Sequence, residues 1–238
     1  SFFSNCEIGS VDFDRCLTKG LNEARPCFRF GDPSLGIPIL EPIFYGPNPV
    51  ATTLDLVLFK ARLGMFNIFE YAWANSTYLK TKTDLPGQKI DIYQFLPYKY
   101  LWGDASFDAV IMETNISRTI QWTMELFDVK QKTTIKRYRN SNKLKVFYAL
   151  TSAREIKFQV KNAIYDAEVE TLLNKMAHRY WKPFYELLKS ALLGLVNAAQ
   201  TKLANEVYPN IKLDELFKPQ FKGGQPWSED LPSAEFVY

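Results

Sequence analysis

The spacing of apolar residues predicts a long helix near the end of the chain. Between Glu168 and Val207, apolar side chains recur every three to four residues with polar residues mostly between them, as on an amphipathic helix. A helix of this length would span roughly 60 Å at 1.5 Å per residue. Pro183 should kink it near Arg179 to Lys182, because proline lacks a backbone donor and clashes with the preceding turn. Such a helix needs an equally long apolar partner.

Strand patterns in the region before this helix supply that partner. Apolar and polar residues alternate there, and a period of two with one polar face is typical of an antiparallel sheet buried on one side. The alternating segments are 54–58, 90–92, 107–111, 120–126, 144–150 and 156–160, with a turn expected at 140–142.

The first part of the chain predicts a short helix followed by an irregular segment. Apolar residues form one face between Ser10 and Arg25, which suits a helix at the surface. Glycine and proline are frequent over 29–49 and argue against a regular helix there. A short helix, a long run of strands and a long helix indicate the α+β class in one continuous domain.

The composition adds limits to this picture. The chain has 238 residues, of which 47% are hydrophobic and 15% aromatic, so it can bury a sizeable core. Its formal charge is only +3, and we therefore do not expect nucleic acid as a partner. Apolar runs stay well below the roughly 20 residues that a transmembrane helix needs.

Three cysteines and two glycosylation sequons bear on the compartment. A disulfide between Cys6 and Cys16 would tie the first residues to the first helix in an oxidising compartment. Cys27 would then be left over, and we expect it to be a buried free thiol. The sequons at Asn75 and Asn115 also fit a secreted glycoprotein.

Four sequence segments occur in a characteristic order. They are Cys6-x9-Cys16-Leu17; Leu35-Gly36-Ile37-Pro38-x-Leu40-x-Pro42; Leu172-x-Asn174-Lys175 with Tyr180-Trp181 and Tyr185-Glu186-Leu187-Leu188-Lys189; and Leu213-Asp214-Glu215-Leu216-Phe217. With these segments the chain resembles the takeout and juvenile hormone binding protein family of insects and related arthropods. The resemblance extends to about Lys218, so we expect one lipid-binding domain over 1–218 and an extended tail over 219–238.

The resemblance implies a specific architecture. A strongly curved antiparallel sheet would wrap around one long C-terminal helix, with a short N-terminal helix and an elongated apolar tunnel between the long helix and the sheet. It also implies a disulfide between Cys6 and Cys16. Family members closest to the hormone-binding branch carry a second disulfide. This chain lacks the cysteines for it, so it is more similar to takeout proteins. Segment 163–167 lacks the Asn-Gly-Asp type of turn that is usual before the long helix.

The residues that catalysis would need are scarce. The chain has one histidine, His178, on the predicted polar side of the long helix with Asn174. A solvated side chain is expected there rather than part of a Ser-His-Asp or Cys-His site. The chain contains no Gly-x-Ser-x-Gly elbow, phosphate-binding loop or dinucleotide fingerprint, and its His and Cys content argues against zinc. We therefore expect neither enzymatic activity, nor a catalytic cofactor, nor a metal.

Inward-facing aromatic and methionine side chains suit a ligand of low polarity. Such side chains grip apolar molecules, and tyrosine hydroxyls can add polar anchors. Each position taken alone is more often plain core, and the resemblance is what favours a hollow seam. The candidate ligand-binding residues are Trp122, Met124, Tyr148, Phe158, Met176, Tyr180, Phe184 and Leu188.

A basic segment adds an alternative function. Between Val129 and Arg154 there are eight basic residues and no acidic ones, either as a solvated face or as a docking patch for an anionic membrane or a receptor. The sequence thus predicts a secreted carrier, in a haemolymph-type fluid or cuticle, of one elongated hydrophobic ligand. This ligand would be of isoprenoid, carotenoid, fatty-acid or juvenile-hormone-like terpenoid type. The alternative is a membrane-docking lipid-transfer or surface-interaction protein that uses 130–154.

Overall fold

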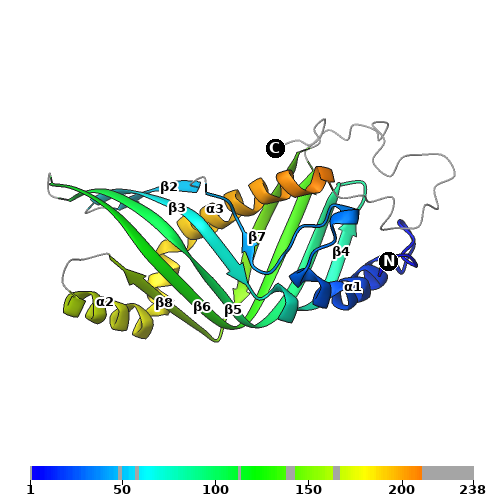
Figure 1. Ribbon diagram of the computed structural model, residues 1–238, viewed down its shortest axis with the longest axis horizontal. Coiled ribbons are helices and arrows are strands. Elements are labelled where there is room, and N and C mark those ends of the chain that lie inside the picture. Colours follow the sequence, from blue (N-terminus) through cyan, green and yellow to red (C-terminus); the bar gives the residue numbers. More distant parts are fainter. Residues whose placement is uncertain are drawn as a thin grey trace.

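The computed structural model describes residues 2–47, 50–56, 59–111, 114–137, 143–162 and 167–210. These residues form an α+β structure with one large antiparallel sheet along the molecule and helices beside it (Figure 1), as the sequence predicts. The strands are β1 (Ile43–Phe44), β2 (Val50–Leu56), β3 (Phe59–Tyr71), β4 (Thr77–Asp84), β5 (Lys89–Ile111), β6 (Thr114–Arg137), β7 (Leu144–Ser152) and β8 (Glu155–Lys161). The α-helices are α1 (Phe13–Ala24), α2 (Ala167–Arg179) and α3 (Trp181–Val207).

The two longest strands, β5 and β6, form the centre of the sheet. They pair antiparallel from Lys89 opposite Lys136 to Ile111 opposite Thr114. β3 and β4 pair with different parts of β5, while β7 and β8 pair with different parts of β6. The predicted alternating segments 90–92 and 107–111 therefore belong to one strand, β5. Its first part pairs with β4 and its second part with β3.

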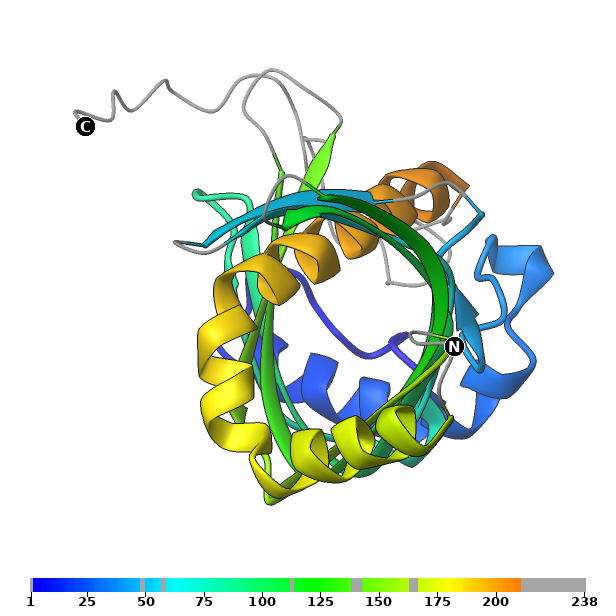
Figure 2. The same ribbon diagram turned by 90° about the vertical axis from the view of Figure 1, so that its left-hand side faces the viewer.

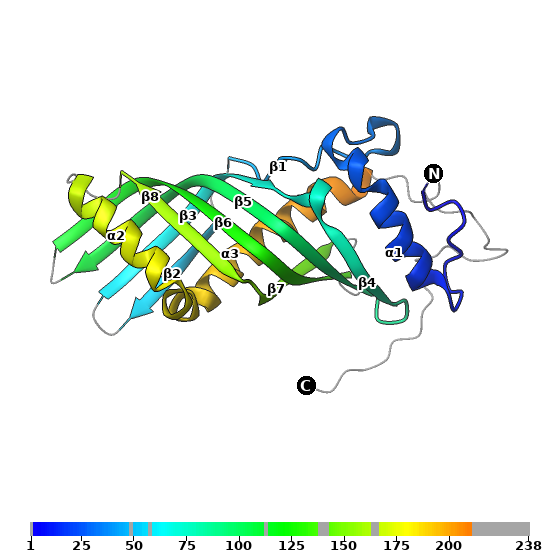
Figure 3. The ribbon, with the colours of Figure 1, turned by 90° about the horizontal axis from the view of Figure 1, so that it is seen from below.

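Helix α3 closes the curved sheet. It packs against β7 at one edge and against β2 at the other. Viewed along the molecule, the strands and the two C-terminal helices form a ring (Figure 2). Helix α2 lies along β8 and α1 along β4, toward opposite ends of the molecule (Figure 3). One face of the sheet is thereby turned toward the inside of the ring.

The prediction of a single helix from Glu168 to Val207 is wrong, because this segment forms two helices, α2 and α3. α2 ends at Arg179, Tyr180 adopts φ −112° and ψ 29°, and α3 begins at Trp181. The cause is Pro183, which has no backbone donor and whose ring clashes with the carbonyl four residues earlier, that of Arg179. The interruption lies where the kink was predicted. Instead of one kinked helix, the chain forms two separate helices that run in different directions (Figure 2).

The N-terminal cysteines confirm one prediction and correct another. Cys6 and Cys16 form a disulfide, with their Cα atoms 5.4 Å apart, and this bond ties the first residues to α1. Cys27 is a free thiol, but it is exposed rather than buried. The reason is its place in the short 3₁₀ helix Arg25–Arg29, in which no residue is buried.

Some predicted features fall outside the described residues. They are the turn at 140–142, most of the segment 163–167 and the tail at 219–238.

Polar side chains on α3 complete the hydrogen bonding of β7. Asn197, Thr201 and Asn205 accept hydrogen bonds from alternate backbone N–H groups of β7 at 2.6 to 2.9 Å. The spacing fits, because four helical residues rise about 6.0 Å and two strand residues about 6.6 Å. The free edge of β7 is therefore covered by a helix rather than by another strand.

The same arrangement occurs at two other edges. On α1, Asp14, Thr18 and Asn22 accept from backbone N–H groups of β4, each at 2.9 Å. On α2, Asn174 both accepts from and donates to the backbone of Val160 in β8, at 3.0 and 2.9 Å. Asn174 therefore binds the sheet instead of lying on the solvated side of its helix as predicted. Covered edges cannot pair with other chains.

Candidate ligand-binding site

A cavity of about 290 Å³ lies between the inner face of the sheet and α3. Its lining is dominated by apolar side chains from five strands and one helix. The apolar lining residues include Leu63, Met65 and Ile68 of β3, Leu101 of β5, Ile120, Trp122, Met124 and Leu126 of β6, Leu150 of β7, Ile156, Phe158 and Val160 of β8, and Leu192, Leu195, Val196 and Ala199 of α3.

The strand alternation aims these side chains inward. Every second residue of β6 from Ile120 to Leu126 lines the cavity, because side chains two apart share one face of a sheet. The register places Met124 between Leu101 of β5 and Phe158 of β8. Rows of apolar side chains therefore cross the three strands and form a continuous wall.

The predicted ligand-binding residues on the strands meet in this cavity. All four contribute to its lining, and one of them, Tyr148, comes from β7 rather than from the central strands. They are Trp122, Met124, Tyr148 and Phe158.

The predicted residues on the helices are placed differently. Tyr180 lies at the break between α2 and α3, is 54% exposed and does not line the cavity. The helical side of the lining instead begins with Trp181 and Tyr185. One residue corresponds to a rotation of about 100° on a helix, so a lining that begins at Trp181 leaves the neighbouring Tyr180 outside the cavity. The side chains of Met176, Phe184 and Leu188 lie outside those described.

A buried ion pair interrupts the apolar lining. The Lys99 ammonium lies 2.5 Å from Glu70 Oε1, and the two side chains are 4% and 2% exposed. Both residues line the cavity. Two other side chains donate hydrogen bonds to the Glu70 carboxylate, the hydroxyl of Tyr45 and the indole nitrogen of Trp73.

The Lys99 ammonium has further partners. It donates to Gln131 Oε1 at 3.3 Å, and Gln131 donates in turn to Gln94 at 3.0 Å. It also lies 5.1 Å from the centre of the Tyr148 ring, which suits a cation–π contact. A connected polar cluster thus borders the apolar cavity.

The surroundings of this cluster determine its protonation. Burial by itself lowers the pKa of Lys99, but the Glu70 carboxylate outweighs that effect and raises the pKa overall. Burial raises the pKa of Tyr45 and Tyr148, and that of Tyr185 to about 12. At neutral pH the lysine is therefore charged, while the three phenols are neutral.

This ion pair was not predicted from the sequence, although strand alternation indicates that both charged residues face inward. Lys99 lies two residues before the inward-facing Leu101, and Glu70 lies two residues after the inward-facing Ile68. Parity along each strand places both charges inside, but only the fold shows that the two strands carry them to the same point.

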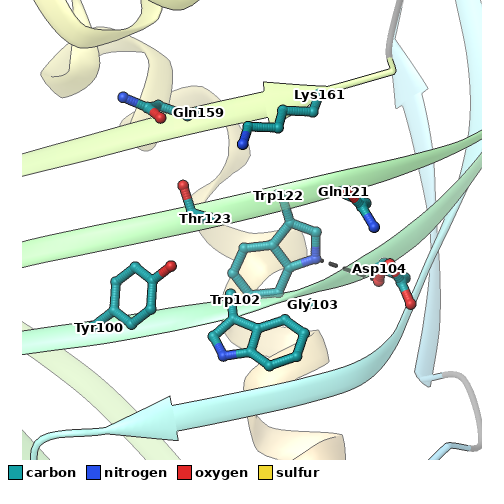
Figure 4. Close-up of a pocket in the computed structure, with 9 residues that line it drawn as sticks. All are labelled: Tyr100, Trp102, Gly103, Asp104, Gln121, Trp122, Thr123, Gln159 and Lys161. Atoms are coloured by element: carbon teal, nitrogen blue, oxygen red, sulfur yellow. Dashed lines mark hydrogen bonds between the residues drawn. The ribbon is translucent and has the colours of Figure 1, made fainter.

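A second hollow, of about 250 Å³, lies on the outer face of the same strands (Figure 4). Trp122 borders it as well, and its indole nitrogen donates to the backbone oxygen of Asp104 at 3.3 Å. Most of its other side chains are polar, which does not suit an elongated apolar ligand. Besides Trp122, the residues that line it are Tyr100, Trp102, Gly103, Asp104, Gln121, Thr123, Gln159 and Lys161.

The described part of the chain offers no group of three or more His, Cys, Asp or Glu side chains that could hold a metal ion. His178 is exposed, and its Nε2 lies 3.7 Å from a Glu155 carboxylate oxygen. Among the same described residues, no helix is long and apolar enough to cross a membrane.

Comparison with known families decides where the chain belongs. The family model described as haemolymph juvenile hormone binding protein matches residues 1–218. The chain belongs to this family. The haemolymph juvenile hormone binding protein family binds lipophilic ligands, and membership confirms the resemblance inferred from the sequence.

A solved structure supports the fold of this family member. Takeout 1 of Epiphyas postvittana is similar with a TM-score of 0.58 and 14% identity, covering 92% of this chain and 100% of that one. At this identity the likeness shows the fold. A lipopolysaccharide binding protein is similar over a smaller share, with a TM-score of 0.26 and 11% identity, covering 67% of this chain and 33% of that one. No curated protein matches the sequence.

Proposed function

We propose that this protein is a secreted carrier that binds one elongated hydrophobic ligand in the cavity between α3 and the sheet, without transforming it chemically. The observation that carries the proposal is the apolar lining shared by five strands and α3. Protein interiors leave few voids larger than a water molecule, so an apolar cavity of this size favours a ligand over solid core. Membership in a family of ligand-binding proteins agrees with this.

The energy available from such a cavity suffices for tight binding. Burying about 400 Å² of apolar ligand surface contributes roughly 10 kcal/mol at about 25 cal/mol/Å², before the entropy cost of association. A catalytic group is not needed for that. The protein would act by sequestering, solubilising and releasing its ligand.

Two features support an extracellular compartment. The Cys6–Cys16 disulfide suits an oxidising, extracellular fluid such as haemolymph or cuticle. The sequon at Asn75 lies at an exposed position, where a glycan would be accessible.

Isoprenoids, carotenoids, fatty acids and juvenile-hormone-like terpenoids all have the elongated apolar shape that the cavity would accept.

Extraction of the native protein with organic solvent, followed by mass spectrometry, tests the proposal. We expect one apolar molecule per chain. Ala199→Trp should abolish its retention, because Ala199 lines the cavity and an indole would occupy the ligand's volume. Ala149→Trp, on an exposed position of β7, is the matched control. A wild-type protein that carries no lipid and takes up no added apolar fluorophore would refute the carrier.

The alternative of membrane docking through 130–154 stays a prediction. Lys132 lies 3.1 Å from Asp91, and Arg154 lies 2.6 Å from Asp128. These acidic partners come from outside the basic segment and lower its effective charge. The carrier is therefore the function that the geometry favours.

A further inference from the structure

The ion pair between Glu70 and Lys99 is an unusual lining for an apolar cavity. Both side chains border the cavity although both are almost fully buried. Removing two charges from water is costly, and apolar residues of similar volume often stabilise a fold as well or better. Recognition of a polar group inside the cavity would explain why a charged pair is placed there.

The pair and its partners lie at one end of the cavity. On the paired strands β5 and β6, the lining reaches Lys99 and Leu126, which are opposite each other. The inward residues beyond this pair are buried and do not border the cavity, among them Leu96, Val129 and Gln131. An elongated ligand would therefore meet the charged pair with one of its ends.

Two tyrosine hydroxyls at this end are available to a ligand. Tyr148 and Tyr185 both line the cavity. Among the described residues, neither hydroxyl has a hydrogen-bond partner. A neutral phenol can both donate and accept one hydrogen bond, and a buried hydroxyl left without a partner is costly. An oxygen atom on the ligand would satisfy both groups.

We propose that Tyr148, Tyr185 and the Glu70–Lys99 pair form a head-group subsite for an apolar chain that ends in a neutral oxygen-bearing group, such as an alcohol, ketone or ester. The subsite rests on the proposed carrier function and narrows its ligand class. The tyrosine hydroxyls hydrogen-bond the ligand oxygen. An ionised carboxylate is disfavoured, because Glu70 already balances Lys99 and a second anion would leave an uncompensated buried charge.

A set of ligands with one chain and different ends tests this subsite. Delipidated protein is titrated near neutral pH with hexadecane, hexadecanol, methyl palmitate and palmitate, each measured by displacement of a bound apolar fluorophore. We expect the alcohol and the ester to bind at least about a hundred-fold more tightly than palmitate, the order of magnitude set by an uncompensated buried charge. They should also bind more tightly than the alkane.

Variants then assign the selectivity to residues. Tyr148→Phe should weaken binding of the alcohol about three- to ten-fold, the worth of one hydrogen bond, and leave the alkane unchanged. Tyr98→Phe is the matched control, because Tyr98 is exposed on the opposite face of β5. Glu70→Gln leaves Lys99 without its anion and should shift the preference toward palmitate. Tyr148→Phe keeps the test decisive if Glu70→Gln does not fold.

The outcomes separate the two proposals. If none of the ligands displaces the fluorophore, including the alkane, the carrier function itself fails. If all bind but palmitate equals or exceeds the alcohol and the ester in wild-type protein, the carrier stands and the head-group subsite is overturned. An unchanged alcohol affinity in Tyr148→Phe would also overturn the role of that hydroxyl.

Discussion

At the residue scale, the contact between Glu70 and Lys99 decides how both charges behave. Burial opposes the charge on Lys99, yet the nearby carboxylate raises its pKa. A group whose folded pKa is raised contributes stability that is fully present below its unfolded pKa, about 10.4 for lysine, and is lost as pH rises through the folded value. The ion pair therefore persists at neutral pH and weakens only under strongly alkaline conditions.

Removing one member of this pair should be far more costly than removing a surface ion pair. Lys99→Met leaves Glu70 buried without its cation and should lower the free energy of unfolding by about 3–5 kcal/mol. Asp128→Asn breaks an exposed pair with Arg154 and should cost less than about 1 kcal/mol. Urea unfolding followed by tryptophan fluorescence measures both. Equal, small losses would contradict the argument from burial.

At the element scale, the helices act as covers for strand edges. Asn197, Thr201 and Asn205 recur every four residues on α3 and meet every second residue of β7. The same spacing on α1 serves β4. The sequence alone does not reveal this role, because nothing local to a helix shows that a strand edge lies beside it. Polar residues thus help to fix the position of α3 on β7.

Thr201→Val tests this role, because it keeps the shape of the side chain and removes the acceptor for the Val146 N–H at 2.9 Å. Leaving that donor unsatisfied should cost about 1–3 kcal/mol of unfolding free energy. Hydrogen exchange of the Val146 amide should accelerate as well. Ser190→Ala, at an exposed position of the same helix, should stay within about 0.5 kcal/mol. Unchanged exchange at Val146 would show that the helix does not protect this edge.

At the scale of the whole molecule, the ligand cavity and the disulfide belong to separate parts. The disulfide lies in a core cluster with Phe3, Phe13 and Leu17. None of these residues lines the cavity, which is bordered instead by the sheet and α3. We therefore expect the N-terminal part to contribute to stability without setting ligand affinity.

Replacing both disulfide cysteines by serine should separate the two properties. The bridged residues are 10 positions apart, and a loop of that size contributes about 2–3 kcal/mol in the chain-entropy description. Thermal unfolding should shift to lower temperature by the corresponding amount. Affinity for an apolar fluorophore at a temperature where the variant is folded should equal that of wild type. A large loss of affinity would mean that the N-terminal part also shapes the cavity.

Local sequence patterns suffice to predict the class of fold and the part of the cavity lining that the strands contribute. Alternation of period two is a local property, so it places Trp122, Met124 and Phe158 on the inner face whatever lies across from them. The resemblance to the juvenile hormone binding protein family and the disulfide also followed from local segments and were confirmed. The covalent and periodic features of a chain can be read without knowing its tertiary contacts.

The face of α3 that lines the cavity, and the residues at the end of the cavity, depend on how the elements pack against each other. The helix is interrupted at Tyr180, so the lining positions of α3 begin at Trp181, and Tyr180 itself lies outside the cavity. The Glu70–Lys99 pair joins two strands that are 29 positions apart in sequence at these residues. Periodicity says which side of its own element a residue occupies, whereas only the packing of elements says what that side meets.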